Sequence, residues 1–472
     1  MLPSESTHAK VQLRPGTTAP DQPEGVATEQ PQNLPFLTNL KMGLFNFGSA
    51  LADILGSGVW NRIMIADLNY PATPVSLLLG LNYFLAPLVV WVGQKSDYTN
   101  WRGYRRLPWI WSGRALIAIG FLLLAFATVE LAESGSNIWW GGIAFALSLT
   151  GIGAVLSGST YTTLIYDRAP PHQRGRAVGL AWTMLLFGFA FSGVLFARLL
   201  PDYSPEGVIT LFVTTVAIIS ALWVFSILGE ERPLPPEARP PRKSARNTPF
   251  MQDFRAVWSQ PTTRLFFLYI GLSFTAAFAQ DQILEPFGGQ VFAMPAGETS
   301  RFAAFWGTTA LLGSLFALYA HRRMSHLTYA RINRYGIWSL ITTFLLLALA
   351  AFSNLEALIR PTLLLFGLGL GLWNIGTWGL MVSVSSAEKA GTYFGLWTMA
   401  SLIFRGGGSV VGAIFRDVAI LTTGSESFSY GAVFAIEALV MLAAFLVIQR
   451  IHFSPQTDAD GKQILVAVGA EG

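Results

Sequence analysis

Long apolar segments alternate with short polar stretches along most of this chain. Most of the segments approach the roughly 20 residues that an α-helix needs to cross a bilayer. A longer polar stretch, rich in Pro and Arg, separates the sixth segment from the seventh. Six spans, a linker and six further spans are typical of a two-bundle transporter. We therefore predict an all-α polytopic membrane protein with 12 transmembrane helices in two six-helix bundles, at approximately 39–64, 73–95, 108–130, 138–164, 176–198, 206–229, 263–285, 300–320, 335–353, 360–384, 393–417 and 428–450.

The polar segments complete the predicted organisation. Residues 1–38 are expected to form a disordered tail, because Pro, Gln, Glu and Thr dominate most of them. The first bundle covers 39–229, the linker 230–262, the second bundle 263–450 and a C-terminal tail 451–472. Lys and Arg concentrate on the linker side, with roughly 20 there and few on the other side, so the positive-inside rule places both termini and the linker in the cytoplasm.

Composition supports a membrane protein and excludes several chemistries. Of the 472 residues, 52% are hydrophobic and only 12% are charged, against about 25% charged in a typical soluble domain. The chain has no Cys, which excludes disulfides and thiolate chemistry, and its five His lie outside the apolar segments. The net charge of +4 comes from Lys and Arg in the loops, so it indicates membrane topology and not nucleic-acid binding.

An internal repeat supports two related halves. "GRAVGLAWTM" begins at Gly175 and "GTYFGLWTM" at Gly391, and each opens the fifth span of its half. Small residues at this spacing let helices pack closely. The equivalent placement favours a duplication.

The stretch "GQKSDYTNWRGYRR" joins the second and third spans. Its pattern resembles the loop signature of the major facilitator superfamily, in which this loop acts as a latch between the two halves. An acid at a helix end can accept from a guanidinium, and a glycine permits a tight turn. The alternative is that the arginines only anchor the loop at the inner membrane surface. This would explain the basic residues but not Asp97 together with Gly93 and Gly103. The predicted latch residues are Gly93, Asp97, Arg102, Gly103, Arg105 and Arg106.

Other stretches resemble a narrower family, the bacteriochlorophyll-delivery branch of PucC and LhaA type. They are "WNRIMIADLNYPAT", "APLVVWVGQKSD", "YRRLPWIW", "DRAPPHQRGRAVG" and "FRGGGSVVGAIFRD". The resemblance implies a protein of the inner or photosynthetic membrane that delivers (bacterio)chlorophyll to light-harvesting antenna complexes, or helps to assemble them. It implies antenna polypeptides and pigment-synthesis proteins as partners, membrane lipid around the chain and a pigment bound transiently.

Charges inside spans need a partner or a purpose, because each costs a few kcal/mol in hydrocarbon. Asp53 in the first span and Arg405 in the eleventh lie at similar depths, and Glu437 in the twelfth also reaches mid-membrane. Arg405 therefore has two candidate carboxylates, and the sequence does not choose between them. The pair could be a structural ion pair or a proton-coupled switch in a central pathway.

Further polar residues are candidates for a pathway or a pigment contact. Gln280, Asp281 and Glu285 are expected near the outer mouth of the seventh span, with the two acids on one helix face. Asn61 and Arg62 lie near Asp67, where a salt bridge could staple the turn. Asn82, Asn374 and Trp378 could line the cavity or make interhelical hydrogen bonds.

A chlorin magnesium prefers oxygen ligands, although imidazole is also possible. Since no His lies at membrane depth, Asn, Gln, Asp or water would have to serve. The rival function is proton-coupled transport of a small solute through Asp53 or Asp281. A membrane enzyme has little support, because the chain lacks a His/Cys metal cluster, a nucleophile elbow and a phosphate loop.

Overall fold

The computed structural model describes residues 33–99, 101–170, 173–231, 233, 258–324, 326–384, 390–457 and 463–468. The expected disordered tail up to residue 32 and most of the linker lie outside the described residues. The helix expected to begin at 39 begins at Phe36. The first half contains α1 (Phe36–Asp53), η1 (Ile54–Trp60), η2 (Ile63–Asp67), α2 (Ala72–Phe84), α3 (Ala86–Tyr98), α4 (Leu107–Ser134), α5 (Ile138–Arg168), α6 (Arg174–Leu199) and α7 (Pro205–Ile227).

The second half has the same helical character and ends in a hairpin. A two-stranded antiparallel sheet replaces part of the expected C-terminal tail. Its elements are α9 (Pro261–Phe278), η5 (Ala279–Gln282), α10 (Leu284–Phe292), α11 (Ala296–Ser300), α12 (Phe302–Arg323), α13 (Tyr329–Ser353), η6 (Glu356–Leu358), α14 (Ile359–Val384), α15 (Ala390–Thr423), α16 (Glu426–Ile448), β1 (His452–Thr457) and β2 (Gln463–Val468).

Ten helices in the described part of the chain are long and apolar enough to cross a membrane. They correspond to the third to twelfth expected spans. The first expected span is instead α1 followed by two π-helical segments. The second is divided between α2 and α3 at Leu85, next to a proline in the first turn of α3. The first two expected spans are therefore not continuous α-helices, because π-helical turns and proline interrupt a regular helix.

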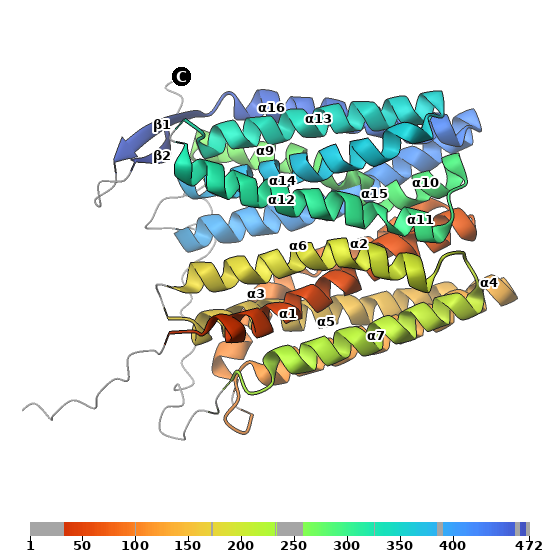
Figure 1. Ribbon diagram of the computed structural model, residues 1–472, viewed down its shortest axis with the longest axis horizontal. Coiled ribbons are helices and arrows are strands. Elements are labelled where there is room, and N and C mark those ends of the chain that lie inside the picture. Colours follow the sequence, from red (N-terminus) through yellow and green to blue (C-terminus); the bar gives the residue numbers. More distant parts are fainter. Residues whose placement is uncertain are drawn as a thin grey trace, which may run out of the picture.

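Two hydrophobic cores lie side by side. One is built almost entirely from the first half and the other from the second, and Figure 1 shows the long helices running parallel to a common axis. Glycines allow the closest helix contacts within each bundle. A Cβ on Gly113 of α4 would lie 2.5 Å from the Gly153 carbonyl oxygen of α5, so only small residues permit this approach.

The repeated helices form the contacts between the bundles. Helix α6 of the first half packs on α12 of the second half, and α15 of the second half packs on α2 of the first. These are the helices that carry the two copies of the repeat, which therefore mark equivalent positions in the two bundles. The start of α1 and the β1–β2 hairpin lie at the same end of the molecule (Figure 1). We call this the linker end and the opposite one the distal end.

Candidate functional site

Arg405 is placed by the glycine-rich stretch of α15. A Cβ on Gly406 would lie 2.6 Å from Tyr83 of α2, and one on Gly412 would lie 2.7 Å from the backbone oxygen of Ala279 in η5. These glycines bring α15 against both the first bundle and the seventh span. The Ser409 hydroxyl also donates to the carbonyl oxygen of Phe278 at 2.9 Å. The side chain of Arg405 consequently projects between α2 and η5.

The partner of Arg405 is Asp281. The Arg405 atoms Nη2 and Nε lie 3.1 and 3.3 Å from Asp281 Oδ2. The Arg405 guanidinium also stacks over Phe278, at 4.5 Å from the ring centroid. The side chains of Arg405 and Asp281 are 31% and 20% exposed. The sequence-based choice between Asp53 and Glu437 was therefore wrong. The 3₁₀ turn of η5 directs the Asp281 side chain toward α15. This direction does not follow from the geometry of a regular α-helix.

Asp53 ends α1 and remains close enough to act on the pair electrostatically. Its side chain is exposed, although hydrophobic residues of α1 and η1 on either side are buried. Asp53 thus faces accessible space beside Arg405 and Asp281. The three residues come together as a central charged cluster, with Asp53 as a nearby carboxylate and not as the direct ion-pair partner.

The polar residues of the seventh span lie inside the protein and not at its mouth. Gln280, Gln282 and Glu285 are only 2%, 3% and 7% exposed. The expected span ended too early at 285, because α10 continues the chain to Phe292. Glu285 lies opposite the first bundle, where a Cβ on Gly58 would be 3.5 Å from its Oε1. The sequence-based interpretation expected these residues to meet water at an outer mouth, whereas Gln280, Gln282 and Glu285 are buried.

Glu437 of α16 is 2% exposed, and both of its carboxyl oxygens are buried without a hydrogen-bond partner. It interacts electrostatically with Asp281. The side-chain oxygens of Gln280 and Gln282 are also buried without a partner. This part of the second bundle is therefore rich in unsatisfied acceptors.

At the distal end, the residues after the first span join the two bundles. Arg62 forms the expected salt bridge with Asp67, and its Nη2 also donates to the Met294 carbonyl oxygen at 2.8 Å. Asn61 Nδ2 donates to the Gln282 carbonyl oxygen at 2.6 Å. Asn61 and Arg62 are 0% and 4% exposed, so they act between the bundles and not only within their own turn.

A second connection between the bundles was not identified from the sequence. The Asp417 carboxylate of α15 accepts from the backbone N–H groups of Ala72 and Thr73 at 3.1 and 2.7 Å, which caps α2. Arg416 donates to the same carboxylate at 2.6 Å and to Gln290. Two adjacent opposite charges near the end of a span were the available signal, but the span was expected to end at 417.

The remaining candidates do not join the charged cluster. Asn82 of α2 faces α5, where a Cβ on Gly151 would lie 2.1 Å from its Oδ1. Asn374 is half-buried and Trp378 is 38% exposed on α14. Two neighbouring α14 residues face the core instead. They are Trp373, which packs on Phe274 and Phe278, and Thr377, which shares a buried hydrogen-bond network with Tyr269 and Asn333.

The loop between α3 and α4 is a tight turn at the linker end. Arg102 and Gly103 have φ values of 55° and 90°, while Trp101 and Tyr104 pair through two backbone hydrogen bonds of 3.0 Å. This confirms the turn assigned to Gly103. Gly93 is half-buried in α3. The side chain of Asp97 lies outside the described residues, so the latch between the two halves stays a prediction.

The arginines of this loop contact the ends of α5 and α7. Arg105 and Arg106 both reach Asp167 Oδ2, at 3.4 and 3.2 Å. The Glu231 carboxylate accepts from the backbone N–H groups of Arg105, Arg106 and Leu107 at 2.7–3.2 Å. A carboxylate on the first N–H groups of a helix is stabilising, so Glu231 fixes the start of α4.

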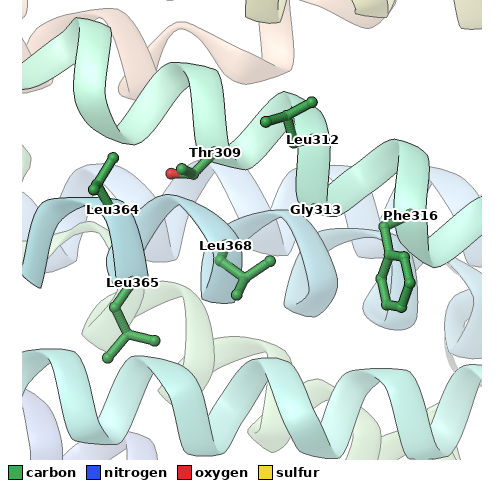
Figure 2. Close-up of a pocket in the computed structure, with 7 residues that line it drawn as sticks. All are labelled: Thr309, Leu312, Gly313, Phe316, Leu364, Leu365 and Leu368. Atoms are coloured by element: carbon green, nitrogen blue, oxygen red, sulfur yellow. The ribbon is translucent and has the colours of Figure 1, made fainter. Parts of the chain in front are cut away.

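No metal cluster marks the site in the part of the chain that the structure describes. It contains no group of three or more His, Cys, Asp or Glu residues able to hold a metal ion. A groove of about 470 Å³ lies between α12 and α14 on the outer surface. Figure 2 shows its mostly apolar lining, with Leu312 and Phe316 on one helix and Leu364 and Leu368 on the other.

Comparison with known proteins identifies the family. The profile described as PUCC protein matches residues 59–455, which include Asn61, Arg62, Arg405 and Asp417. The chain belongs to the PUCC protein family. A relative named Protein PucC, from Rhodobacter capsulatus, is 27% identical over 441 residues, covering 89% of this chain and 92% of the relative. Another from that species, named Bacteriochlorophyll synthase 44.5 kDa chain, is 28% identical over 428 residues, covering 88% and 95%.

The fold is shared with solved membrane transporters. A solved D-xylose-proton symporter superposes with a TM-score of 0.60 at 15% identity, covering 86% of this chain and 96% of the symporter. This likeness shows the fold alone. The PUCC chain is thus a multi-pass membrane protein with a transporter-type fold, although one relative carries a synthase name.

Proposed function

We propose that this PUCC-family protein delivers (bacterio)chlorophyll to light-harvesting antenna complexes, or assists their assembly, in the inner or photosynthetic membrane. The observation that carries the proposal is the family match over residues 59–455, together with relatives in Rhodobacter whose names refer to PucC and to bacteriochlorophyll. Antenna polypeptides and pigment-synthesis proteins are the partners that follow from it. In the proposed orientation both termini are cytoplasmic.

Four residues within the matched range also occupy positions suited to a structural role. Asn61, Arg62 and Asp417 join the two bundles, while Arg405 sits in the central cluster. Residues that only face lipid would not need these polar contacts. A function common to the family would therefore use the interface between the bundles, where a cargo can contact both halves.

The interior offers oxygen atoms for brief contact with a chlorin. Magnesium is a hard cation that takes oxygen ligands, and the buried side-chain oxygens of Asn82, Gln280 and Gln282 have no hydrogen-bond partner. Phe278 and Tyr83 add ring surface beside Arg405. Such neutral amide oxygens are weak ligands, which suits transient handling better than permanent storage.

The test is gentle purification from native membranes, followed by visible and near-infrared absorption spectra and a gel of the co-purifying subunits. Pigment bands at a reproducible ratio that survive washing, together with antenna polypeptides, would support delivery. Antenna polypeptides without pigment would restrict the role to assembly. The absence of both pigment and antenna polypeptides from the purified sample would contradict the proposal.

The second candidate is proton-coupled transport of a small solute, favoured by Asp53 in accessible space beside the Arg405–Asp281 pair. Carboxylates inside a span mark ion or proton pathways in many transporters. The variants Asp53→Asn and Asp281→Asn separate the two functions. Loss of solute uptake with normal antenna content would favour transport, whereas loss of antenna content without an uptake defect would favour assembly.

A further inference from the structure

The central charged cluster and the acids next to it contain more carboxyl groups than the single guanidinium of Arg405 can neutralise. Asp281 interacts electrostatically with Asp53, Glu285 and Glu437, and all of these acids come from different elements. Among these acids, Arg405 interacts with Asp281 and Asp53, and it forms its ion pair with Asp281. If every acid were ionised, several negative charges would remain without a counter-charge in the protein interior. A low-dielectric environment makes that state very unfavourable.

The tyrosines of α16, α9 and α2 in this part of the protein have partners of their own. Tyr430, on the same helix, donates to Gln290 at 2.7 Å and lies under the Arg416 guanidinium. Tyr269 of α9 is bound in the hydrogen-bond network with Thr377 and Asn333. Tyr83 of α2 faces Arg405. Thus Asp281 is the charged group with which Glu437 interacts.

Glu437 is the acid least able to carry a negative charge. It is 2% exposed, and both of its oxygens are buried without a donor. Its neighbours along α16, Phe434, Ala438 and Met441, belong to the hydrophobic core. An unpaired carboxylate in such surroundings costs several kcal/mol, and binding a proton removes that cost. The side chain of Asp53 is exposed by contrast.

We propose that Glu437 is a proton-binding site, which holds a proton while Arg405 is paired with Asp281. Loss of this proton would add another negative charge near Asp281, whose own charge is balanced by Arg405. Proton binding at α16 is thereby coupled to the ion pair that holds η5 against α15. The inference does not depend on which cargo the protein handles.

Infrared spectroscopy of the purified full-length protein in lipid nanodiscs tests this site, because a protonated carboxyl has its own C=O stretching band. At neutral pH we expect this band in the wild type and the loss of one component in Glu437→Gln. Glu426→Gln removes an exposed acid at the start of the same helix and should leave the band unchanged. A Glu437→Gln spectrum identical to the wild type would overturn the proposal.

Two further measurements keep the proposal testable. If Glu437→Gln does not fold, as judged by size-exclusion chromatography, Glu437→Asp retains the acid. The proposal then expects the component to shift in frequency, and an unshifted band would overturn it. Adding Mg²⁺ or Ca²⁺ to the wild type should leave the component in place. Its disappearance on adding either ion would identify a metal-cation site and overturn the proton assignment.

Discussion

Breaking the Arg405–Asp281 ion pair, by substituting either residue, should lower the free energy of unfolding of the protein. Removing one partner of a buried ion pair typically costs about 3–5 kcal/mol. These side chains are 31% and 20% exposed, so water reduces that penalty, and we expect about 2 kcal/mol for Asp281→Asn. Arg405→Gln should cost about 1 kcal/mol more, because it also removes the cation–π contact with Phe278.

A double-mutant cycle measures the interaction itself. Asp281→Asn/Arg405→Gln should be less destabilised than the sum of the two single variants, with a coupling energy of about 1–2 kcal/mol. The assay is reversible unfolding in mixed detergent micelles, which gives the free energy of unfolding of each variant. The surface pair Arg360–Glu298 provides a matched control, since its Arg is 61% exposed and its coupling should stay below about 1 kcal/mol.

The cycle also separates the two roles considered for the pair. In a structural role, the double variant should recover part of its stability and its antenna-forming activity together. In a switch role, stability should recover while activity remains lost. Additive single effects, with no coupling energy, would refute the direct contact between Arg405 and Asp281.

Three further substitutions, one of them with a matched control, test other parts of the fold by thermal unfolding of the purified protein. Asp417→Ala should destabilise it by about 1–2 kcal/mol, because α2 loses its cap, and an unchanged melting temperature would contradict the cap. Gly412→Ala should cost about 1–3 kcal/mol, since its Cβ meets backbone, while Gly407→Ala on the same helix has open space and should be neutral or stabilising. Glu231→Ala should cost about 1 kcal/mol at the start of α4, and no loss there would refute its role.

The positions of most spans follow from the hydrophobic pattern, because a lipid-facing helix must be apolar over most of its length. The third to twelfth expected spans correspond to the ten candidate membrane helices. The first two spans departed from the expectation through backbone geometry. The π-helical turns from Ile54 to Asp67 and the break at Leu85 depend on tertiary contacts, which hydropathy does not contain.

The candidate site was predicted in its residues but not in its pairing. Depth along a regular helix placed Asp53 and Arg405 at similar levels, and the two do lie in one cluster. The 3₁₀ turn at Ala279–Gln282 and the continuation through α10 brought Asp281 inward. Neither the rotation of a side chain about its helix nor the contact between two bundles can be read from spacing within one helix.

The proposed role in antenna formation is tested most directly by deleting the gene in its native host and recording the near-infrared absorption of the membranes. The account predicts that the antenna bands are lost and that a plasmid copy of the wild-type gene restores them, while Arg405→Gln/Asp281→Asn serves as the site-directed comparison. Antenna bands of normal height in the deletion strain, with no related gene expressed in its place, would contradict the central claim.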